Sequence, residues 1–540
     1  MAFRPLLNLL SNASSPKQTL LLKNASIVGV GTLLSRVAGL VRDQVTAFYF
    51  GAGPVADAFF VAFRLPNLLR RLLAEGALTP AFVPIFTEKL VKEGPLEAGI
   101  LFRGVFSFMA IVLAMITVLG IIAAPFLTRL IAPGFAADPE LFELTVLLSR
   151  VLFPYIFLIT LTALAMGVLN SLGRFNIPAL GPVFLNISII FGAVVISPRL
   201  ETPIIGLALG ALLGGITQLA IQLPGVRRAG IALGFTVNFK DPAIWRVFKL
   251  MAPTALGAAA YQISIFINTQ LASFLEEGSV SYLYYADRLT QFPLGVFSLA
   301  LATAILPAMA REKAKGDIKA FWSLFQKTLK FQFFITLPAT VGLMIMAEPL
   351  VSLLFERGHF TSASSLKTAQ ALWGYAVGLP FLSGTAIVAR VFFSQGDTRV
   401  PAKVAAVSLA LGILFALLLL TPFKHVGLAL ASSLASLVNF VALVWILRRR
   451  EKIPVSPFLK DAGISLAAAL FMGLALWPLY HSEVYGGFQR LPLVVAGLLV
   501  GPFLYFALAF LLRSPNMDPL RETGQKLWAK FRRPRHGARP

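Results

Sequence analysis

The stretch that decides the fold reads SRVAGLVRDQVTAFYF from Ser35 to Phe50 and DAFFVAFRLPNLLRRLLAEG from Asp57 to Gly76. Both parts are apolar enough for a membrane-spanning helix, yet both carry arginines and carboxylates. A charged side chain that faces hydrocarbon at the centre of a bilayer costs about 2.5–3.5 kcal/mol or more. Because a chain retains such groups where they face a wet interior, we expect a helical bundle around a polar cavity. Cations outnumber anions in these two helices, which predicts an anionic cargo.

Composition places the whole chain in a membrane. Of its 540 residues, 57% are hydrophobic and 13% are charged, whereas about a quarter of a soluble protein is charged. Apolar runs of about 20 residues, long enough to span a bilayer, recur along the chain, and the sequence shows no series of short alternating segments typical of a β-barrel. We predict an all-α polytopic membrane protein with about fourteen transmembrane helices. The expected spans are 24–50, 57–87, 101–132, 141–170, 177–197, 203–223, 243–275, 281–310, 321–354, 366–394, 401–421, 425–447, 461–480 and 491–512.

The sequence argues against several classes of site. It contains no cysteine, which excludes disulfides and thiolate chemistry. The net charge of +23 does not come from one basic patch, so no nucleic-acid partner is expected. The four histidines lack the spacing of metal ligands; they are His359, His425, His481 and His536. We predict no metal and no cofactor, and we leave open whether a coupling cation takes part.

The loops predict the orientation of the chain in the membrane. Basic residues such as Lys89 and Arg227 gather in alternate loops, and the intervening loops are richer in acids such as Glu276. The positive-inside rule then places both termini in the cytoplasm. Residues 1–23 lack the features of a cleaved signal, and residues 513–540 form a basic tail whose simplest role is contact with anionic lipid.

The chain resembles itself at an offset near 223 residues, and five short patterns return at that spacing. The pairs are Ala123-x-Pro125 with Ala347-x-Pro349, Ala81-x-x-Pro84 with Ala304-x-x-Pro307, Gly173 and Pro178 with Gly396 and Pro401, Gly206-Leu207 with Gly427-Leu428, and Arg64-Leu65 with Arg288-Leu289.

This repeat predicts two pseudo-symmetric six-helix lobes, residues 24–223 and 243–447, joined by a cytoplasmic linker at 224–242. Two further helices occupy 448–512. Lobes repeated in the same orientation are related by an axis along the membrane normal, a plan known from transporters with a substrate site between the lobes. Rocking of the lobes would give alternating access.

Helical spacing groups the charges within the predicted spans. Residues seven apart share a helix face, so Arg36 and Asp43 face the same way. The second helix carries a polar stripe, within which we expect Pro66 to bend the helix. The stripe consists of Asp57, Arg64, Asn67, Arg71 and Glu75, and a later helix adds Asp287 and Arg288.

Two interpretations of these charges are open. Arg42, Arg71 and Arg288 each have an acid close by in sequence, so the charges could form structural ion pairs. Arg70 lies off the stripe and could reach the membrane interface, and Asp57 could stabilise a helix start. The surplus of positive charge favours a functional interpretation, in which guanidinium forks hold the oxygens of a phosphate or pyrophosphate headgroup.

The same residues carry a resemblance to a known family. Ser35–Asp43, Asp57–Arg71, Ala74–Ala77, Ala132–Phe135 and Tyr284–Leu289 resemble the MurJ family, the bacterial lipid II flippases of peptidoglycan synthesis. The resemblance implies a MATE-like fold of the MOP superfamily, with a central cationic cavity and two C-terminal helices that form a groove for a polyprenyl tail. The cavity residues that it implies are Arg36, Arg42, Arg64, Arg70 and Arg288, with the acids Asp43, Asp57, Glu75 and Asp287.

These observations together predict a flippase and not an enzyme, with many spans in the bacterial cytoplasmic (inner) membrane. It would move lipid II, an undecaprenyl-pyrophosphate disaccharide-pentapeptide, from the inner to the outer leaflet. Membrane lipids and cell-wall synthesis enzymes are the other expected partners. The sequence has no phosphate-binding G-x-x-x-x-G-K-[ST] motif, so an ion gradient, the membrane potential or removal of product must drive transport.

Four alternatives remain at this point. Two are transporters: a flippase for another polyprenyl-linked saccharide and a MATE-type ion-coupled exporter, although a carrier of cationic drugs would favour an acidic cavity. The third is a membrane enzyme acting on lipid pyrophosphates, which would need an acidic metal site or a placed histidine. The fourth is a scaffold for cell-wall enzymes.

Overall fold

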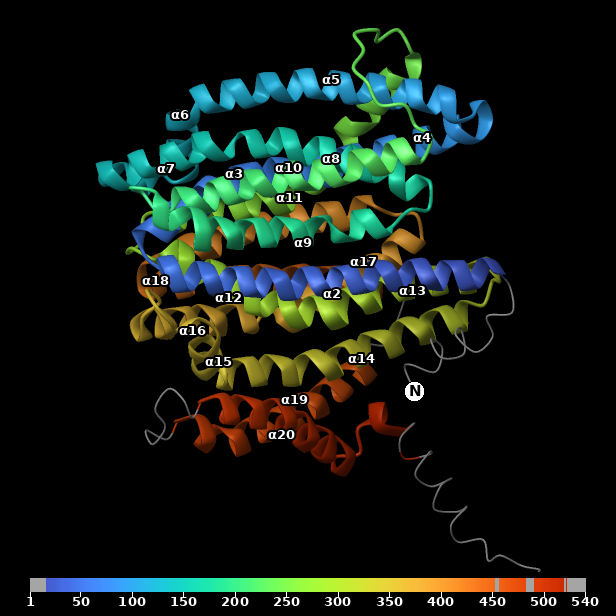
Figure 1. The fold of residues 1–540 in the computed structure, drawn as a ribbon. Helices are drawn as coiled ribbons and strands as arrows, with labels where there is room; N and C mark the ends of the chain where they lie inside the picture. The colour runs from blue at the N-terminus through green and yellow to red at the C-terminus, as the bar shows by residue number, and fades with distance from the viewer. Residues whose placement is uncertain (1–15, 452–455, 482–489, 519–520, 522–540) are drawn as a thin grey trace, which may run out of the picture.

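The computed structural model describes residues 16–451, 456–481, 490–518 and 521. Within these ranges every regular element is a helix, and the long helices run side by side in one bundle (Figure 1). Nine of the described helices are long and apolar enough to cross a membrane. The number of fourteen spans stays a prediction, because charged helices such as that at 16–50 are not among the nine. The chain before residue 16 and most of the basic tail lie outside the described residues.

The first half of the chain forms the helices that precede the linker. Several begin with proline, whose missing N–H costs nothing in the first turn of a helix. These helices are α2 (Pro16–Phe50), α3 (Pro54–Leu69), η1 (Arg70–Leu78), α4 (Thr79–Glu93), α5 (Pro95–Ile122), α6 (Ala124–Ile131), η2 (Pro133–Ala137), α7 (Pro139–Leu152), α8 (Pro154–Ser171), α9 (Asn176–Phe191), η3 (Gly192–Ile196), η4 (Ser197–Arg199) and α10 (Ile205–Arg228).

The second half continues after the linker. Its helices are α11 (Pro242–Ala272), α12 (Ser279–Pro293), η5 (Leu294–Ser298), α13 (Leu299–Ala314), α14 (Ile318–Ile345), α15 (Ala347–Phe355), α16 (Ser362–Ala376), α17 (Leu379–Ser394), α18 (Arg399–Glu451), α19 (Ser456–His481), α20 (Arg490–Leu511) and η7 (Pro515–Met517). Non-helical backbone at Lys424 divides α18 in two, which agrees with the predicted separate spans at 401–421 and 425–447.

The repeated sequence patterns coincide with repeated structural features. Ala123 separates the long helix α5 from the short α6, and the matching pattern at Ala347 begins the short α15 after α14. Gly173 and Gly396 both have a positive φ, at the ends of α8 and α17. The π-helices η1 and η5 interrupt the second helix of each half, and they begin 224 residues apart, at Arg70 and Leu294.

The interruption of the second helix differs in place from the expected bend. Pro66 lies inside α3 and is buried, and the regular α-helical pattern ends only at Leu69, where η1 begins. A π-helix bonds i to i+5 and so shifts the faces of all later residues. The polar stripe expected from a uniform helix therefore does not continue in one register through Arg71 and Glu75.

Two ends of the bundle can be told apart. We call the end at which α3, α12 and α16 begin the Asp57 end, and the opposite end the Lys89 end; α6 and α15 mark the Asp57 end at the left of Figure 1. At the Asp57 end a single apolar core combines both halves of the chain, including Ala47 and Phe60 with Tyr285 and Phe360. Toward the Lys89 end there are two apolar cores: one joins the first half to the beginning of α11 through residues such as Ile244 and Val247, and the other lies within the second half and α19.

The linker and α11 connect the halves at the Lys89 end. Lys89 of α4 lies 2.5 Å from the Asp241 carboxylate, and Asp241 in turn caps the start of α11. Arg246 of α11 reaches Glu88 at 3.0 Å. Helix α11 also packs against η1 and α18, so it contacts both halves along its length.

The last two long helices lie at one edge of the bundle (Figure 1). Helix α19 packs on α14, and α20 packs on α19 and α15. Lys330 of α14 and Asp461 of α19 form an ion pair at 2.7 Å, and the Asp461 side chain is almost fully buried.

Candidate functional site

The centre of the site is a network that joins α2 of the first half to α12 of the second. Two guanidinium groups share one carboxylate: Arg42 Nη2 lies 2.6 Å from Asp43 Oδ1, and Arg288 Nε lies 3.4 Å from Asp43 Oδ2. Tyr284 Oη lies between them, 2.9 Å from Arg42 Nη2 and 3.0 Å from Arg288 Nη2. The cluster therefore has more positive charge than its own carboxylate can neutralise.

Two residues of this network were not among the predicted site residues. Asn186 of α9 accepts a hydrogen bond from Arg42 Nη1 at 3.1 Å and donates one to the Ser35 carbonyl at 3.1 Å. Tyr284 stacks on Phe60 with ring centroids 3.9 Å apart and donates to Asp43 at 3.1 Å. Asn186 is a polar residue in an otherwise apolar predicted span, and Tyr284 lies four residues before Arg288, so both left a weak signal in the sequence.

Arg36 also reaches α12, from a position six residues nearer the start of α2 than Arg42. Its Nη1 lies 3.5 Å from the carbonyl oxygen of Gln291. A Cβ built on Gly295 would lie 2.0–2.3 Å from the Arg36 guanidinium, so the group rests against a position that only glycine leaves open. Arg36 and Asp43 do both face α12, as their spacing of seven residues predicts.

Asp57 does not join the arginine network. It is 2% exposed and accepts hydrogen bonds from Gly278 N at 2.7 Å, Ser281 N at 2.8 Å and Ser281 Oγ at 2.5 Å. These donors belong to the first turn of α12, so Asp57 stabilises a helix start, but that of the other half of the chain. The structure thus places Asp57 in the contact between the halves.

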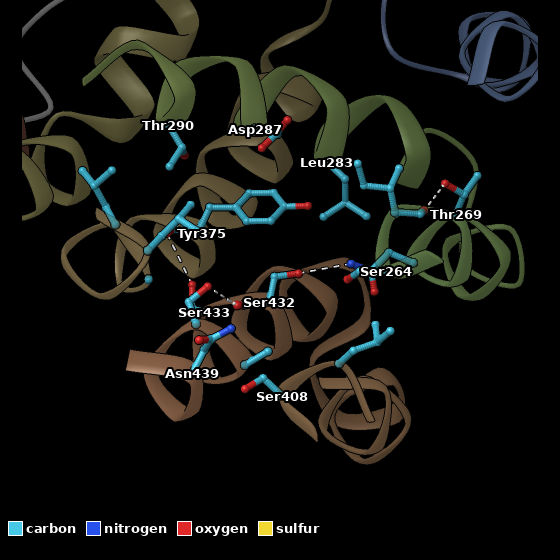
Figure 2. Close-up of a pocket in the computed structure, with 18 of the residues that line it drawn as sticks. Ser264, Thr269, Leu283, Asp287, Thr290, Tyr375, Ser408, Ser432, Ser433 and Asn439 are labelled. Atoms are coloured by element: carbon cyan, nitrogen blue, oxygen red, sulfur yellow. Dashed lines mark hydrogen bonds between the residues drawn. The ribbon is translucent and has the colours of Figure 1, made fainter. Parts of the chain in front are cut away.

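Arg64 and Asp287 line a different space, a cavity of about 320 Å³ within the second half of the chain (Figure 2). Asp287 accepts a hydrogen bond from Gln291, whereas its neighbour Arg288 turns to Asp43. Consecutive residues of a helix point about 100° apart, which explains why these two acquire different partners. Tyr284 lines the same cavity, so it forms a wall between the cavity and the arginine network.

The rest of the predicted stripe lies farther along the second helix. Asn67 donates to the Phe63 carbonyl at 3.1 Å and accepts from Arg70 Nε at 3.3 Å. Arg71 lies in η1 and is partly buried, and the side chain of Glu75 lies outside the described residues. The structure therefore separates the predicted set into the network around Asp43, the cavity rim and the η1 region.

The arginines lie deep in the bundle. Arg42 is eight residues from the end of α2 and Arg288 nine from the start of α12, which places them about 12–14 Å from the Asp57 end. Arg36 lies about 21 Å from that end. The hydrocarbon core of a bilayer is about 30 Å thick, so all three are near its middle. Such a cluster can bind an anion whose oxygens accept several charge-assisted hydrogen bonds.

A metal site was not expected from the sequence. Among the described residues no group of three or more histidine, aspartate or glutamate side chains lies close enough to hold a metal ion. The acceptors near the arginines are already bonded to cationic or neutral donors.

Comparison with known proteins identifies the family of the chain. A family model described as lipid II flippase MurJ matches residues 46–495. A probable lipid II flippase MurJ from Rhizobium meliloti (strain 1021) is 38% identical over 93% of this chain and 96% of the relative. A solved structure described as lipid II flippase MurJ in an inward closed conformation covers 90% of this chain and 98% of that one, with a TM-score of 0.77 and 27% identity.

The fold itself extends beyond that family. An inward-facing structure of a multidrug resistance MATE transporter of the MOP superfamily aligns with a TM-score of 0.64 over 79% of this chain, at 16% identity. This likeness confirms the predicted MATE-like helical fold. The match of the family model over most of the chain, together with relatives well above 30% identity, shows that the chain belongs to the lipid II flippase MurJ family.

Proposed function

We propose that this chain moves the lipid-linked peptidoglycan precursor, undecaprenyl-pyrophosphate disaccharide-pentapeptide, from the inner to the outer leaflet of the bacterial inner membrane. The observation that carries this proposal is the pair of partly buried arginines, Arg42 and Arg288, that share one carboxylate across the two halves of the chain. The name shared by the relatives, lipid II flippase, supports a lipid-linked pyrophosphate as the anion that these arginines bind.

Orientation follows from the charge of the two ends. The loops that meet at the Lys89 end are those with the basic residues, so the positive-inside rule assigns this end and both termini to the cytoplasm. One apolar core joins the halves at the Asp57 end, whereas toward the Lys89 end α11 is the one described helix of the second half that contributes to the core of the first. A bundle joined at its outer end receives substrate from the cytoplasmic side.

Binding would exchange one anion for another. In the observed state the two guanidinium groups donate to Asp43 and Tyr284. A pyrophosphate offers more acceptor oxygens and more charge than one carboxylate, and it can bind each guanidinium through two parallel hydrogen bonds. Asp43 keeps the arginines ordered before the headgroup arrives and gives up part of its contacts when it binds.

Opening toward the outer side requires the contact at Asp57 to break. Asp57 of α3 holds the first turn of α12 through three hydrogen bonds. Arg42 lies on α2, which directly precedes α3, and Arg288 lies on α12 itself. A headgroup that bridges the two arginines acts close to this contact. Release on the outer side is then coupled to separation of the halves there, which is the alternating-access cycle of this fold class.

The polyprenyl tail would remain in lipid while the headgroup crosses. Helices α19 and α20 lie at the edge of the bundle beside α14, and they expose large apolar side chains such as Leu474 and Phe503. The ion pair between Lys330 and Asp461 fixes α19 to this edge. We assign the tail to the surface formed by these helices. Contacts with cell-wall synthesis enzymes, and a coupling cation, stay predictions.

Reconstituted transport tests the proposal. The purified chain is placed in liposomes that carry lipid II in one leaflet, and the appearance of the headgroup in the other leaflet is measured. Arg42→Ala and Arg288→Ala are each expected to lower transport by about tenfold or more, because a charge-assisted hydrogen bond contributes about 1.5–3 kcal/mol. Arg150→Ala, outside the network, serves as the matched control.

Binding separates this function from its alternatives. Lipid II is expected to bind more tightly than undecaprenol, which has the tail without the pyrophosphate. Equal affinity for the two lipids, or full transport by both arginine variants, would contradict the assignment of the pyrophosphate to this network.

A further inference from the structure

The cavity in the second half of the chain has polar walls made mainly of uncharged residues. Its described lining comes from α11, α12, α16, α17 and both parts of α18, and Arg64 of α3 is the one described lining residue from the first half. Hydroxyl and amide side chains dominate its polar surface. Figure 2 shows Ser264, Ser408, Ser432 and Asn439 among them, and Asn268 and Thr385 also line the cavity. Charge is confined to Arg64 and Asp287.

Part of this polar wall is internally bonded. Asn268 donates to Ser432 Oγ at 3.1 Å, and Ser433 donates to the Gly374 carbonyl at 2.6 Å. Ser436 and Thr290 bond back to carbonyls of their own helices. These groups are structural and do not call for a ligand.

Three polar atoms of the wall are different. Thr385 Oγ1, Ser408 Oγ and Asn439 Oδ1 are buried and find no hydrogen-bond partner anywhere in the described chain. Ser408 is only 4% exposed. A buried polar atom without a partner costs about 1–3 kcal/mol. Three such atoms from α17 and the two parts of α18 around one cavity indicate that the site is built to bind something.

The chemistry of the three atoms defines the ligand class. Each can accept a hydrogen bond, so the ligand supplies O–H or N–H donors. The described walls hold a single carboxylate, Asp287, which is already bonded to Gln291, so a tightly bound cation is disfavoured. A neutral ligand with several hydroxyl and amide groups fits these walls.

The volume of the cavity and one aromatic side chain in its wall narrow the class of ligand further. Ligand pockets span about 300–1,000 Å³, and the volume of about 320 Å³ suits one sugar unit better than a whole disaccharide-pentapeptide. The ring of Tyr375 extends across the cavity in Figure 2 and offers an apolar face to a ligand. Polar groups in a ring around one aromatic face are the chemistry that recognises a saccharide.

We propose that this cavity binds a saccharide unit of the lipid-linked substrate, an inference that rests on the proposed function. The arginine network could hold a pyrophosphate without this cavity. Tyr284 is the wall common to both sites: it bonds Arg42 and Arg288 and also lines the cavity. A sugar attached directly to a pyrophosphate held by these arginines lies next to the cavity. The arginines then select the pyrophosphate, and the cavity selects what is attached to it.

Two ligands that differ only in the sugar test this inference. Lipid II and undecaprenyl pyrophosphate share the tail and the pyrophosphate, and the second lacks the saccharide and peptide. Thr385→Val and Ser408→Ala remove one acceptor each with little change in shape. Each is expected to weaken binding of lipid II by about two- to tenfold, the effect of one hydrogen bond, and to leave binding of undecaprenyl pyrophosphate unchanged.

A matched control checks the substitution itself. Thr336→Val in α14 makes the same chemical change at a buried threonine that bonds its own helix through the Gln332 carbonyl and does not line the cavity. It is expected to bind both lipids like the unchanged chain. Asn439→Leu removes an acceptor and also fills part of the cavity. It is expected to weaken binding of lipid II, relative to undecaprenyl pyrophosphate, more than either single hydroxyl variant does.

Several results would overturn the inference. One is an equal loss of affinity for both lipids, and another is unchanged affinity for both. A third is a thermal stabilisation by sodium ions that the cavity variants abolish, which would assign the cavity to a cation. Failure of the unchanged chain to bind lipid II more tightly than undecaprenol would instead overturn the proposed function, and this inference with it.

Discussion

At the scale of single residues, the site depends on a position that has no side chain. The Arg36 guanidinium lies where a Cβ on Gly295 would be, and it reaches the Gln291 carbonyl beside it. Gly295 belongs to η5, the π-helical segment that follows α12. Arg36 comes from the first half of the chain and Gly295 from the second. This glycine therefore leaves the space beside α12 that the Arg36 guanidinium occupies.

Gly295→Ala is expected to displace Arg36 and to lower transport of lipid II by about tenfold, because one charge-assisted contact is lost. Alanine favours a helix over glycine by about 1 kcal/mol, so loss of helix stability is not expected to cause the effect. The measurement is leaflet-resolved transport together with the melting temperature. In a double-variant cycle, Gly295→Ala should add little to Arg36→Ala if both act through one contact.

Gly342→Ala is the matched control for this substitution. Gly342 lies in α14, and a Cβ there would meet no atom within 4 Å. Transport by this variant should equal that of the unchanged chain. Independent, additive effects of Gly295→Ala and Arg36→Ala would contradict a positioning role for Gly295.

The individual site residues show what a sequence can and cannot predict. The contact of Arg42 with Asp43 followed from their adjacency, and the common face of Arg36 and Asp43 followed from helical spacing. The partner of Asp57 did not follow, because Ser281 is 224 residues away in the chain. Nothing in a single sequence states which helix start a buried carboxylate will reach.

At the scale of elements, a single carboxylate in the loop before α18 contacts both the first and the last turn of that helix. Asp397 accepts hydrogen bonds from the backbone N–H groups of Arg399 and Val400 at the start of α18. The same carboxylate lies 2.7 Å from Arg450 at its far end. One side chain thus joins the beginning and the end of an element that runs out and back. The preceding Gly396 has φ +83°, which permits the turn into it.

This contact predicts a pH dependence of stability. The hydrogen bond from Arg450 and those from the backbone hold the pKa of Asp397 below its usual value. Since the folded pKa lies below the unfolded one of about 3.9, the stabilisation is present above that pH and is lost as pH falls through the folded pKa. Asp397→Ala should therefore lower the melting temperature at pH 7 and have a smaller effect near pH 3. An equal decrease at both pH values would show that the charge is not responsible, and Arg450→Gln should reproduce the pH dependence of the difference.

The boundaries of elements followed from the sequence where a local signal exists. The span predicted at 491–512 matches α20 to within a few residues at both ends. The span predicted at 203–223 matches the start of α10 equally well, but α10 continues past its predicted end. The expected span 101–132 instead consists of α5 and the separate short helix α6, divided at Ala123. The π-helix η1 was not predicted. Its hydrogen bonds differ from those of an α-helix by one residue, a difference that leaves no pattern in the sequence, and the segment packs against α11, which is distant in the chain.

At the scale of the whole molecule, the distribution of apolar cores describes the conformational state. One core crosses between the halves at the Asp57 end, and separate cores lie toward the Lys89 end. The repeat predicted two similar halves, and η1 and α6 of the first half have counterparts in η5 and α15 of the second. Which end the halves share could not be predicted, because apolar residues of membrane helices look alike whether they face lipid or a partner helix.

The apolar core shared at the Asp57 end suggests a test of whether the two halves separate there during transport. The sequence contains no cysteine, so an introduced pair needs no altered background. His359 N donates to the Phe48 carbonyl at 2.9 Å across the two halves at the Asp57 end. In the double variant Phe48→Cys and His359→Cys, oxidation is expected to form a disulfide, since adjacent backbones of this kind bring Cα atoms within about 7 Å.

If the Asp57 end must open in each cycle, this disulfide should stop transport, and a reducing agent should restore it. The matched controls are the single variants Phe48→Cys and His359→Cys, which cannot form this disulfide and should keep transport active under the same oxidising conditions. Lipid II should still bind to the locked chain from the Lys89 side, because the arginine network does not include either cysteine. Continued transport by the fully oxidised Phe48 and His359 pair would mean that the headgroup crosses without separation of the halves at this end.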